Sequence, residues 1–434
     1  MLKMRYDPID KSFFVKNRKK FLAKMSKRGL AFFNSNDNYP VSADTTLPFE
    51  QHRDIFYLTG INQNETILAL YNGDAEGETL EMLFVTKPNK ILTHWEGERL
   101  DETTAFKISG IEKVYWIDDL EKKIDDLMVK TDFLYINNNE HYRAKVETET
   151  REERFNKWIQ KKFPKKSIKK SNPILQRLRS VKGKLELNLI KKACQITELG
   201  FRRVLKFIRP GVWEYEIEAE FAHEFLKNKS RKFAYSPIIA SGENSNILHY
   251  IENNSQCKKD DLVLLDVGAE YANYSSDMTR TVPVNGKFNN RQKKVYNSVL
   301  YVKNQATKLL KPGILWAEHH KEVGKIMTSE LLKLGLLDKA DIQAQTDKNP
   351  AFKKYFTHGT SHHLGLDTHD YGDINLPVEE NNVFTVEPGI YIPKEGFGIR
   401  LEDDVVVQKE GDPINLMKNI PIEIDEIEYL MNLK

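Results

Sequence analysis

The chain has 434 residues, more than one compact hydrophobic core usually holds, so two domains are expected. Its 66 basic and 63 acidic side chains nearly balance, which argues against the basic excess typical of nucleic-acid binding. Only two cysteines are present, Cys194 and Cys257, so a disulfide framework is excluded and a reducing compartment is expected.

The N-terminal residues carry scattered charges and lack the continuous apolar stretch of a signal peptide. No segment of the sequence has the roughly 20 consecutive apolar residues that a membrane-spanning helix requires. We therefore expect a cytoplasmic protein that does not contact membranes.

The N-terminal part of the sequence predicts strands that alternate with helices. Runs rich in β-branched and aromatic residues predict strands at 67–71, 82–86, 113–117 and 133–137. Helices are expected at 11–28 and 141–163. This alternation favours an α/β domain. Its histidines are isolated from one another and indicate no catalytic cluster.

A change of composition at residues 160–173 indicates the boundary between the two domains. The segment holds six lysines and two prolines with little apolar patterning. Charge runs of this kind are usually solvated surface, so we prefer that interpretation to a nucleic-acid patch. The expected domains are residues 1–172 and 173–434.

Beyond the boundary the sequence predicts long helices and strand pairs. Helical spacing of apolar residues covers 184–208, 213–228, 290–310 and 317–336. A strand is expected to begin in the segment DLVLLDVGAEY. The resulting layout is α+β, with helices grouped between hairpins.

Four acids and one histidine in this part have the residue types of a metal site. They are Asp266, Asp277, His362, Glu387 and Glu402, and the histidine lies in the cluster HGTSHHLGLDTHD. Any one acid alone could be a solvated strand residue or half of a salt bridge. Four carboxylates directed at one point would repel each other, and divalent cations would relieve that repulsion.

The spacing of the first two acids fits a hairpin. A hairpin pairs residues whose numbers have a constant sum. Asp266 and Asp277 therefore face each other if the turn is centred between Tyr271 and Ala272. Directly opposed residues have Cβ atoms roughly 4.5–5.5 Å apart, a separation that suits a shared metal.

The other two acids fit a second hairpin. Glu387 and Glu402 face each other if the turn is centred between residues 394 and 395. The flanking Pro393 and Gly396 favour a turn there. Oxygen-rich ligation with one imidazole suits Mn²⁺ or Mg²⁺, and a pair of such ions activates water, which predicts a hydrolase.

Several motifs in order along the chain resemble one family. They are RDIFYLTGI in the N-terminal half, then RLRSVKGKLELNLIKKACQIT, SDMTRTVPVNGKF, HGTSHHLGLDTHD, TVEPGIYI and GIRLEDDVVV. Together they resemble the aminopeptidase P and prolidase branch of the pita-bread metallopeptidases, nearest to the bacterial Xaa-Pro aminopeptidases. The resemblance implies a pseudo-two-fold α+β pita-bread catalytic domain, an antiparallel sheet covered by helices. An α/β creatinase-like domain would precede it.

The resemblance also assigns roles to individual residues. It implies two divalent ions, expected to be Mn²⁺, with Asp277 and Glu402 bridging them and Asp266, His362 and Glu387 completing the set. His363 beside the ligand receives no role. The catalytic residues would be Glu387 for proton transfer, with His249 and His369 at the peptide. The pocket for the proline ring would be lined by His358, Tyr391 and Arg400.

The activity implied is release of the N-terminal residue from peptides with proline in second position. The alternatives are a prolidase that cleaves Xaa-Pro dipeptides, a methionine aminopeptidase, and a non-catalytic or metal-free pita-bread protein. The family also implies a homodimer or homotetramer. One departure is Glu50, where related N-terminal domains often have a basic residue; here Arg53 follows three residues later.

Overall fold

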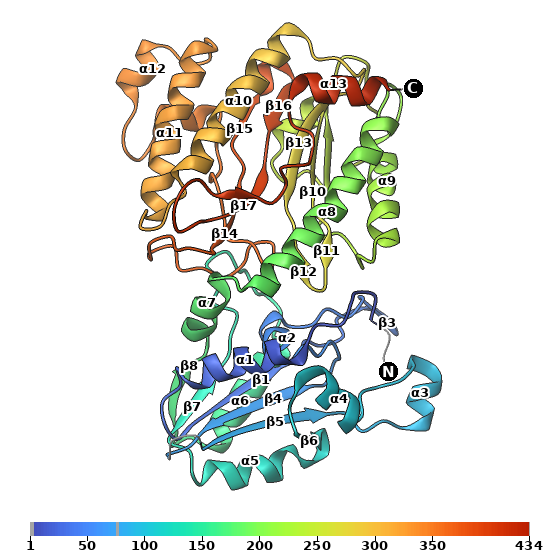
Figure 1. Ribbon diagram of the computed structural model, residues 1–434, viewed down its shortest axis with the longest axis vertical. Helices are drawn as coiled ribbons and strands as arrows, with labels where there is room; N and C mark the ends of the chain where they lie inside the picture. Colours follow the sequence, from blue (N-terminus) through green and yellow to red (C-terminus); the bar gives the residue numbers. More distant parts are fainter. Residues whose placement is uncertain (1–3, 75–77, 434) are drawn as a thin grey trace. The chain divides into compact units, whose positions relative to one another are not determined.

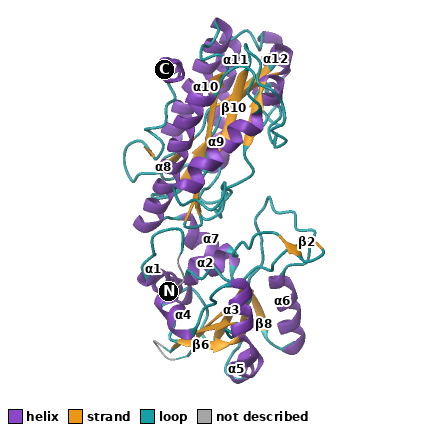
Figure 2. Cartoon of the chain, turned by 90° about the vertical axis from the view of Figure 1, so that its right-hand side faces the viewer, coloured by secondary structure: helices purple, strands orange, loops and turns teal. Residues whose placement is uncertain are grey.

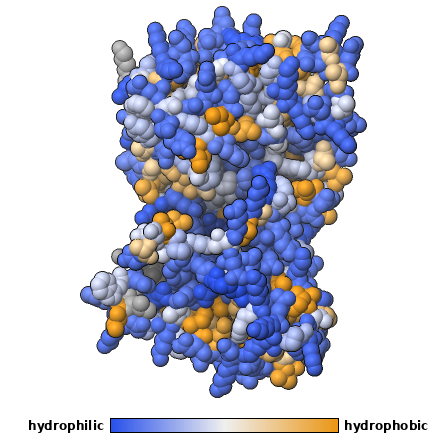
Figure 3. Space-filling view, turned by 180° about the vertical axis from the view of Figure 1, so that it is seen from behind, coloured by the Kyte–Doolittle hydropathy of each residue, from blue (hydrophilic) through white to orange (hydrophobic). Residues whose placement is uncertain are grey.

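The structure is a computed structural model that describes residues 4–74 and 78–433. They form two compact units, Met1–Leu178 and Arg179–Lys434, each described by itself below (Figure 1). Among the described residues, no helix has the length and apolar character needed to cross a bilayer. The face shown in Figure 3 is mostly hydrophilic, with apolar residues in small separate groups.

The N-terminal unit is built on a six-stranded mixed sheet in the order β6-β5-β4-β1-β7-β8. Strand β4 is antiparallel to β1 and β5, whereas β5–β6, β1–β7 and β7–β8 are parallel pairs. The strands are β1 (Gly29–Asn34), β4 (Ile67–Asn72), β5 (Thr79–Val85), β6 (Lys113–Trp116), β7 (Phe133–Ile136) and β8 (Ser167–Lys170). A small hairpin of β2 (Pro40–Ser42) and β3 (Thr45–Thr46) stands apart from this sheet.

Helices pack on the sheet through two alternating sets of apolar residues. Phe32 and Ile67 belong to the set that packs with α5 and α6, whereas Phe33 belongs to the other set and meets Phe21 of α1 edge to face. The helices of this unit are α1 (Lys11–Leu22), α2 (Arg53–Thr59), α3 (Lys90–Glu96), α4 (Glu102–Ser109), α5 (Leu120–Met128) and α6 (Arg151–Lys162), and α7 (Asn172–Ser180) spans the boundary after Leu178.

All four strands predicted in this unit are present, but both predicted helices are too long. The helix expected over 11–28 ends at Leu22. The helix expected over 141–163 begins only at Arg151, because Thr150 caps it in a capping box with Glu153. Strand β1 was not predicted, although it is buried throughout and apolar except at Asn34.

The lysine-rich segment 160–173 is exposed or half-buried except at Ser171 and Asn172, in keeping with the expected surface segment, yet it contains the edge strand β8. This strand was missed because lysine and serine have low β-propensity. Its backbone pairs with β7 on one side only. Lysines on such a strand discourage further sheet pairing with another chain.

The C-terminal unit surrounds short antiparallel sheets with long helices (Figures 1 and 2). All four predicted long helices are present, with ends within a few residues of the prediction. The helices are α8 (Lys184–Phe207), α9 (Glu214–Lys227), α10 (Asn290–Leu309), α11 (Trp316–Lys333), α12 (Lys339–Ala344) and α13 (Ile424–Asn432).

Two groups of strands carry the predicted acids. The first group comprises β9 (Ile238–Ser241), β10 (Leu262–Val267) and β13 (Met278–Pro283), with a hairpin tip of β11 (Glu270–Tyr271) and β12 (Tyr274–Ser275). The second comprises β14 (Val383–Val386), β17 (Asp403–Val406) and β18 (Ile414–Asn415), and the pair β15 (Gly389–Ile392) and β16 (Phe397–Arg400).

Candidate metal centre

The first hairpin has a register different from the predicted one. Asp266 lies opposite Thr279, and the turn is formed by Ala272 and Asn273. Both turn residues have positive φ angles, 53° and 67°, the conformation of a tight two-residue hairpin turn. The predicted centre was therefore wrong by one residue. Asp277 comes two residues before Thr279, so the two acids share a face as diagonal neighbours rather than as a directly opposed pair.

The second hairpin has the predicted register. Ile390 pairs with Ile399 on one side of the two acids, and Val386 pairs with Asp403 on the other. The register of both pairs places Glu387 opposite Glu402. The turn contains Pro393–Glu395 and ends at Gly396, whose φ is 74°.

Main-chain hydrogen bonds join this hairpin to the segments that carry the other ligands. The amide of Glu402 donates to the carbonyl of Thr279 over 3.0 Å, and Thr279 lies two residues after Asp277 in the chain. The amide of Glu387 donates to the carbonyl of Thr360 over 2.8 Å, and Thr360 lies two residues before His362 in the chain. Three segments far apart in the sequence therefore meet around the acids.

Three of the five predicted ligands form a tight group among the described residues. Asp277, His362 and Glu402 are buried, and each offers a ligand atom within 4.8 Å of the others. Nε2 of His362 lies 3.3 Å from Oδ2 of Asp277 and 3.7 Å from Oε1 of Glu387. Its Nδ1 lies 2.9 Å from the carbonyl oxygen of His363, so that backbone contact keeps Nε2 directed at the acids.

Asp266 joins the group through Tyr235. The Tyr235 hydroxyl lies 2.6 Å from Oδ1 of Asp266 and 2.5 Å from Oδ1 of Asp277. Burial and the two acids raise the pKa of Tyr235 well above its usual value, so the hydroxyl keeps its proton and can donate it. Tyr235 lies in a loop and has no spacing relation to the acids, so it could not be predicted from the sequence.

A network of polar side chains extends from Asp266 to His358. Arg400 donates to Oδ2 of Asp266 over 2.5 Å and to the Tyr391 hydroxyl over 2.8 Å. Nε2 of His358 lies 2.7 Å from the same hydroxyl. Nδ1 of His358 lies 3.5 Å from Oε2 of Glu387. The three residues predicted to line a proline pocket are thus one connected group beside the acids.

The two remaining histidines lie at different distances from this group. The His369 ring meets the His362 ring edge to face, with centroids 4.4 Å apart. His249 is exposed in a turn, and its electrostatic effect contributes to lowering the pKa of His358. The neighbouring Tyr250 packs in the same apolar cluster as Tyr391.

Burial and mutual repulsion make the ionised acids unfavourable without a cation. Burial, followed by repulsion from Asp277, Glu387 and Asp266, raises the pKa of Glu402 well above its usual value. Burial likewise raises the pKa of Asp266, against the opposing effect of Arg400. Carboxylate oxygens with one imidazole nitrogen are a donor set suited to hard divalent ions such as Mn²⁺ and Mg²⁺. The residues therefore fit a metal centre.

Replacing Tyr235 by phenylalanine is expected to weaken metal binding roughly 10–100-fold, the usual cost of losing a group that orients ligands. The reason is that one hydroxyl holds both Asp266 and Asp277. Titration of chelator-stripped protein with Mn²⁺ measures the effect. Tyr274→Phe is the matched control, because that buried hydroxyl donates to Glu186 instead. Equal metal affinity in the two variants would contradict the assignment.

Comparison with known proteins decides the family. Residues 188–409 match the model of metallopeptidase family M24, and residues 14–135 match the N-terminal domain of aminopeptidase P. The chain belongs to metallopeptidase family M24. The match to the family covers the segments of all five predicted ligands.

Relatives of this M24 member extend over nearly its full length. It is 33% identical to the Xaa-Pro aminopeptidase of Escherichia coli, over 98% of both chains. It is 32% identical to the Xaa-Pro aminopeptidase of Haemophilus influenzae, also over 98% of both. The family predicted from the sequence motifs is confirmed.

Solved structures share the fold. A putative aminopeptidase P from Bacillus anthracis has a TM-score of 0.91 at 33% identity and covers 98% of both chains. A glutamate-to-alanine variant of Escherichia coli aminopeptidase P in complex with substrate has a TM-score of 0.89 at 32% identity, covering 98% of this chain and 99% of that one. The prediction of an α/β N-terminal domain followed in the chain by a pita-bread domain is confirmed.

Proposed function

We propose that this M24 metallopeptidase is a Xaa-Pro aminopeptidase that releases the first residue of peptides with proline in second position. The observation that carries the proposal is the buried group of Asp277, His362 and Glu402 in a chain similar over its whole length to Xaa-Pro aminopeptidases. Residues 1–172 would be the N-terminal domain and residues 173–434 the catalytic domain.

All five predicted ligands take part in the proposed metal centre. Asp277 and Glu402 would hold both ions, Asp266 would complete one, and His362 with Glu387 the other. We propose Mn²⁺ as the metal, in keeping with the oxygen-rich donor set. When bound, such ions polarise a peptide carbonyl and lower the pKa of water.

Glu387 is the proposed proton carrier between water and the leaving nitrogen of proline. Its side chain is 18% exposed, compared with 7% for Asp277, so it is the more accessible of the two. His369 beside His362, and His249 near His358, would orient the peptide by hydrogen bonding.

The connected group of His358, Tyr391 and Arg400 is the proposed pocket for the proline ring. Burial and the nearby Arg400 lower the pKa of His358 to about 3, so its imidazole is neutral near pH 7. A neutral ring held against the Tyr391 hydroxyl offers a largely uncharged wall to the apolar pyrrolidine ring. Selectivity for proline would come from shape, because the proline nitrogen in the scissile bond has no N–H.

A prolidase is the nearest alternative, because it cleaves Xaa-Pro dipeptides with the same ligand set. Full-length similarity to Xaa-Pro aminopeptidases favours the aminopeptidase. We further propose a homo-oligomer in the cytoplasm.

The deciding experiment uses chelator-stripped protein reloaded with Mn²⁺ and three peptides. Ala-Pro-Phe should release alanine, whereas Ala-Ala-Phe, which lacks proline, and the dipeptide Ala-Pro should react far more slowly. Preferential cleavage of Ala-Pro would establish the prolidase instead. Absence of metal-dependent alanine release from both proline peptides would overturn both.

A further inference from the structure

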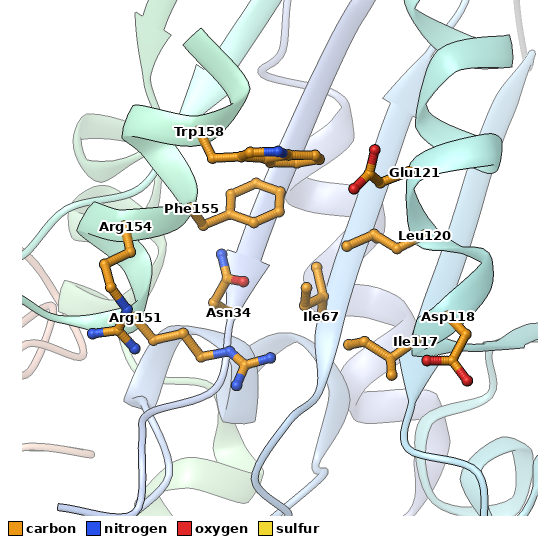
Figure 4. A pocket seen from close by; sticks show the side chains of 10 residues that line it. All are labelled: Asn34, Ile67, Ile117, Asp118, Leu120, Glu121, Arg151, Arg154, Phe155 and Trp158. Carbon is orange, nitrogen blue, oxygen red and sulfur yellow. The ribbon is translucent and has the colours of Figure 1, made fainter. Parts of the chain in front are cut away.

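The N-terminal unit contains a cavity that shares no residue with the metal centre. It has a volume of about 510 Å³ and lies between α5 and α6 over strands β1 and β4 (Figure 4). This volume is within the range of small-molecule sites, roughly 300–1,000 Å³. The cavity is at the end of the sheet where the parallel strands β1 and β6 finish, a common position for ligands in α/β folds.

The body of the cavity is apolar and partly open to water. Phe155 and Trp158 on α6 face Ile117 and Leu120 across it, with Ile67 at its base (Figure 4). These four wall residues are only half-buried. An apolar ligand would cover them and gain free energy from the area removed from water.

A buried polar atom at the base of the cavity has no partner. Asn34 is 1% exposed, and its Oδ1 accepts no hydrogen bond among the described residues. Its Nδ2 is occupied, because it donates to Oε1 of Glu152 over 3.0 Å. Figure 4 shows Oδ1 turned toward the centre of the cavity. An unpaired buried acceptor is costly, so a ligand that donates a hydrogen bond there would be favoured.

Arg151 supplies a positive charge to the same space. Its guanidinium extends across the base of the cavity, and no described residue is hydrogen-bonded to it (Figure 4). Burial lowers the pKa of Arg151 and outweighs the opposing attraction of Glu65, Asp37 and Glu152. The neighbouring Arg154 differs, because both oxygens of Asp37 already bind it, over 2.7 and 2.9 Å.

The opposite wall is acidic. Asp118 and Glu121 line the cavity from the α5 side (Figure 4), and Lys162 donates to Oε2 of Glu121 over 3.0 Å, so Asp118 is the carboxylate without a described ion pair. A ligand in the cavity therefore lies between the guanidinium of Arg151 on one side and carboxylates on the other, with the unpaired Oδ1 of Asn34 at the base. A zwitterion with an apolar side chain matches all of these features.

We propose that this cavity binds a free α-amino acid with a large apolar or aromatic side chain. The carboxylate pairs with Arg151, the ammonium group donates to Asn34 Oδ1 under the attraction of Asp118 and Glu121, and the side chain packs against Phe155 and Trp158. This site is separate from peptide cleavage and stands whatever substrate the metal centre accepts.

The test is calorimetric titration of the full chain with L-phenylalanine. Saturable binding is expected, and Arg151→Gln should weaken it by roughly 10-fold or more, because a charge-assisted hydrogen bond is lost. Phenylalaninamide lacks the carboxylate and 3-phenylpropionate lacks the ammonium group, so both should bind more weakly by a similar factor. The matched control is Lys161→Gln, which removes one exposed charge from the same helix and should leave affinity unchanged.

Two further variants keep the result decisive. Glu121 has a mostly exposed side chain, so Glu121→Gln can be made without risk to the core; it ends the surface ion pair with Lys162 and should reduce affinity a few-fold. Asp277→Asn disrupts the metal centre and should leave L-phenylalanine binding intact. Loss of binding in Asp277→Asn would assign the ligand to the metal centre and overturn the proposal. So would absence of saturable binding, or equal affinity in Arg151→Gln and wild type.

Discussion

The Glu402→Gln variant is expected to lose metal-dependent cleavage and to bind Mn²⁺ more than about 100-fold less tightly. Groups that only orient the ligands already change metal affinity roughly 10–100-fold when they are lost, and Glu402 belongs to the proposed ligand group itself. The amide still accepts the hydrogen bond of the Thr279 hydroxyl, which lies 2.6 Å away. The loss should therefore come from the missing charge and not from a collapsed strand.

The same variant should melt at a higher temperature than wild type when both are stripped of metal. Burial, followed by repulsion from three neighbouring acids, raises the pKa of Glu402, so its ionised form destabilises the metal-free protein. Scanning calorimetry with and without Mn²⁺ measures this. The exposed Glu410→Gln is the matched control and should change neither quantity. A variant with wild-type metal affinity would show that Glu402 is no ligand.

Glu387→Gln is expected to lower kcat by roughly 10²–10⁴-fold, the usual contribution of a positioned acid or base. The amide retains an oxygen that can contact a metal but cannot carry the proton. Burial, with repulsion from Asp277 and Asp266, raises the pKa of Glu387 to about 7, although His362 and Arg400 oppose this. In the metal-free protein, ionising this carboxyl therefore costs free energy that a bound cation would relieve.

The measurement for this variant separates turnover from binding. Steady-state kinetics on Ala-Pro-Phe at saturating Mn²⁺ should show a fall in kcat with a much smaller change in KM. Metal content is determined on the same samples, so that a loss of metal is not mistaken for a loss of proton transfer. Full turnover in the metal-loaded variant would remove Glu387 from its proposed role.

The two hairpins show how far local sequence predicts geometry. The second register could be predicted because Pro393 and Gly396 flank its turn and restrict it. The first could not, because Ala272 and Asn273 adopt positive φ where only the asparagine favours it. The error of one residue changed the partner of Asp266 but not the face on which it lies.

Contacts between distant segments set the rest of the site. Tyr235 reaches Asp266 from a loop, and Arg400 reaches it from a strand 134 residues away. No spacing rule links such residues, so the sequence identified the acids without revealing what holds them. In the N-terminal unit the edge strand β8 was missed for another reason, since pairing with β7 overrides the low propensity of its lysines.

The main-chain bonds from Glu387 and Glu402 to Thr360 and Thr279 have a consequence for the life cycle of the enzyme. Because backbone atoms hold the three segments together, we expect the scaffold to assemble without an ion. Newly made chains would then finish folding first and acquire their metal afterwards. An ion removed by a chelator, or exchanged for another, would be restored to the same folded molecule.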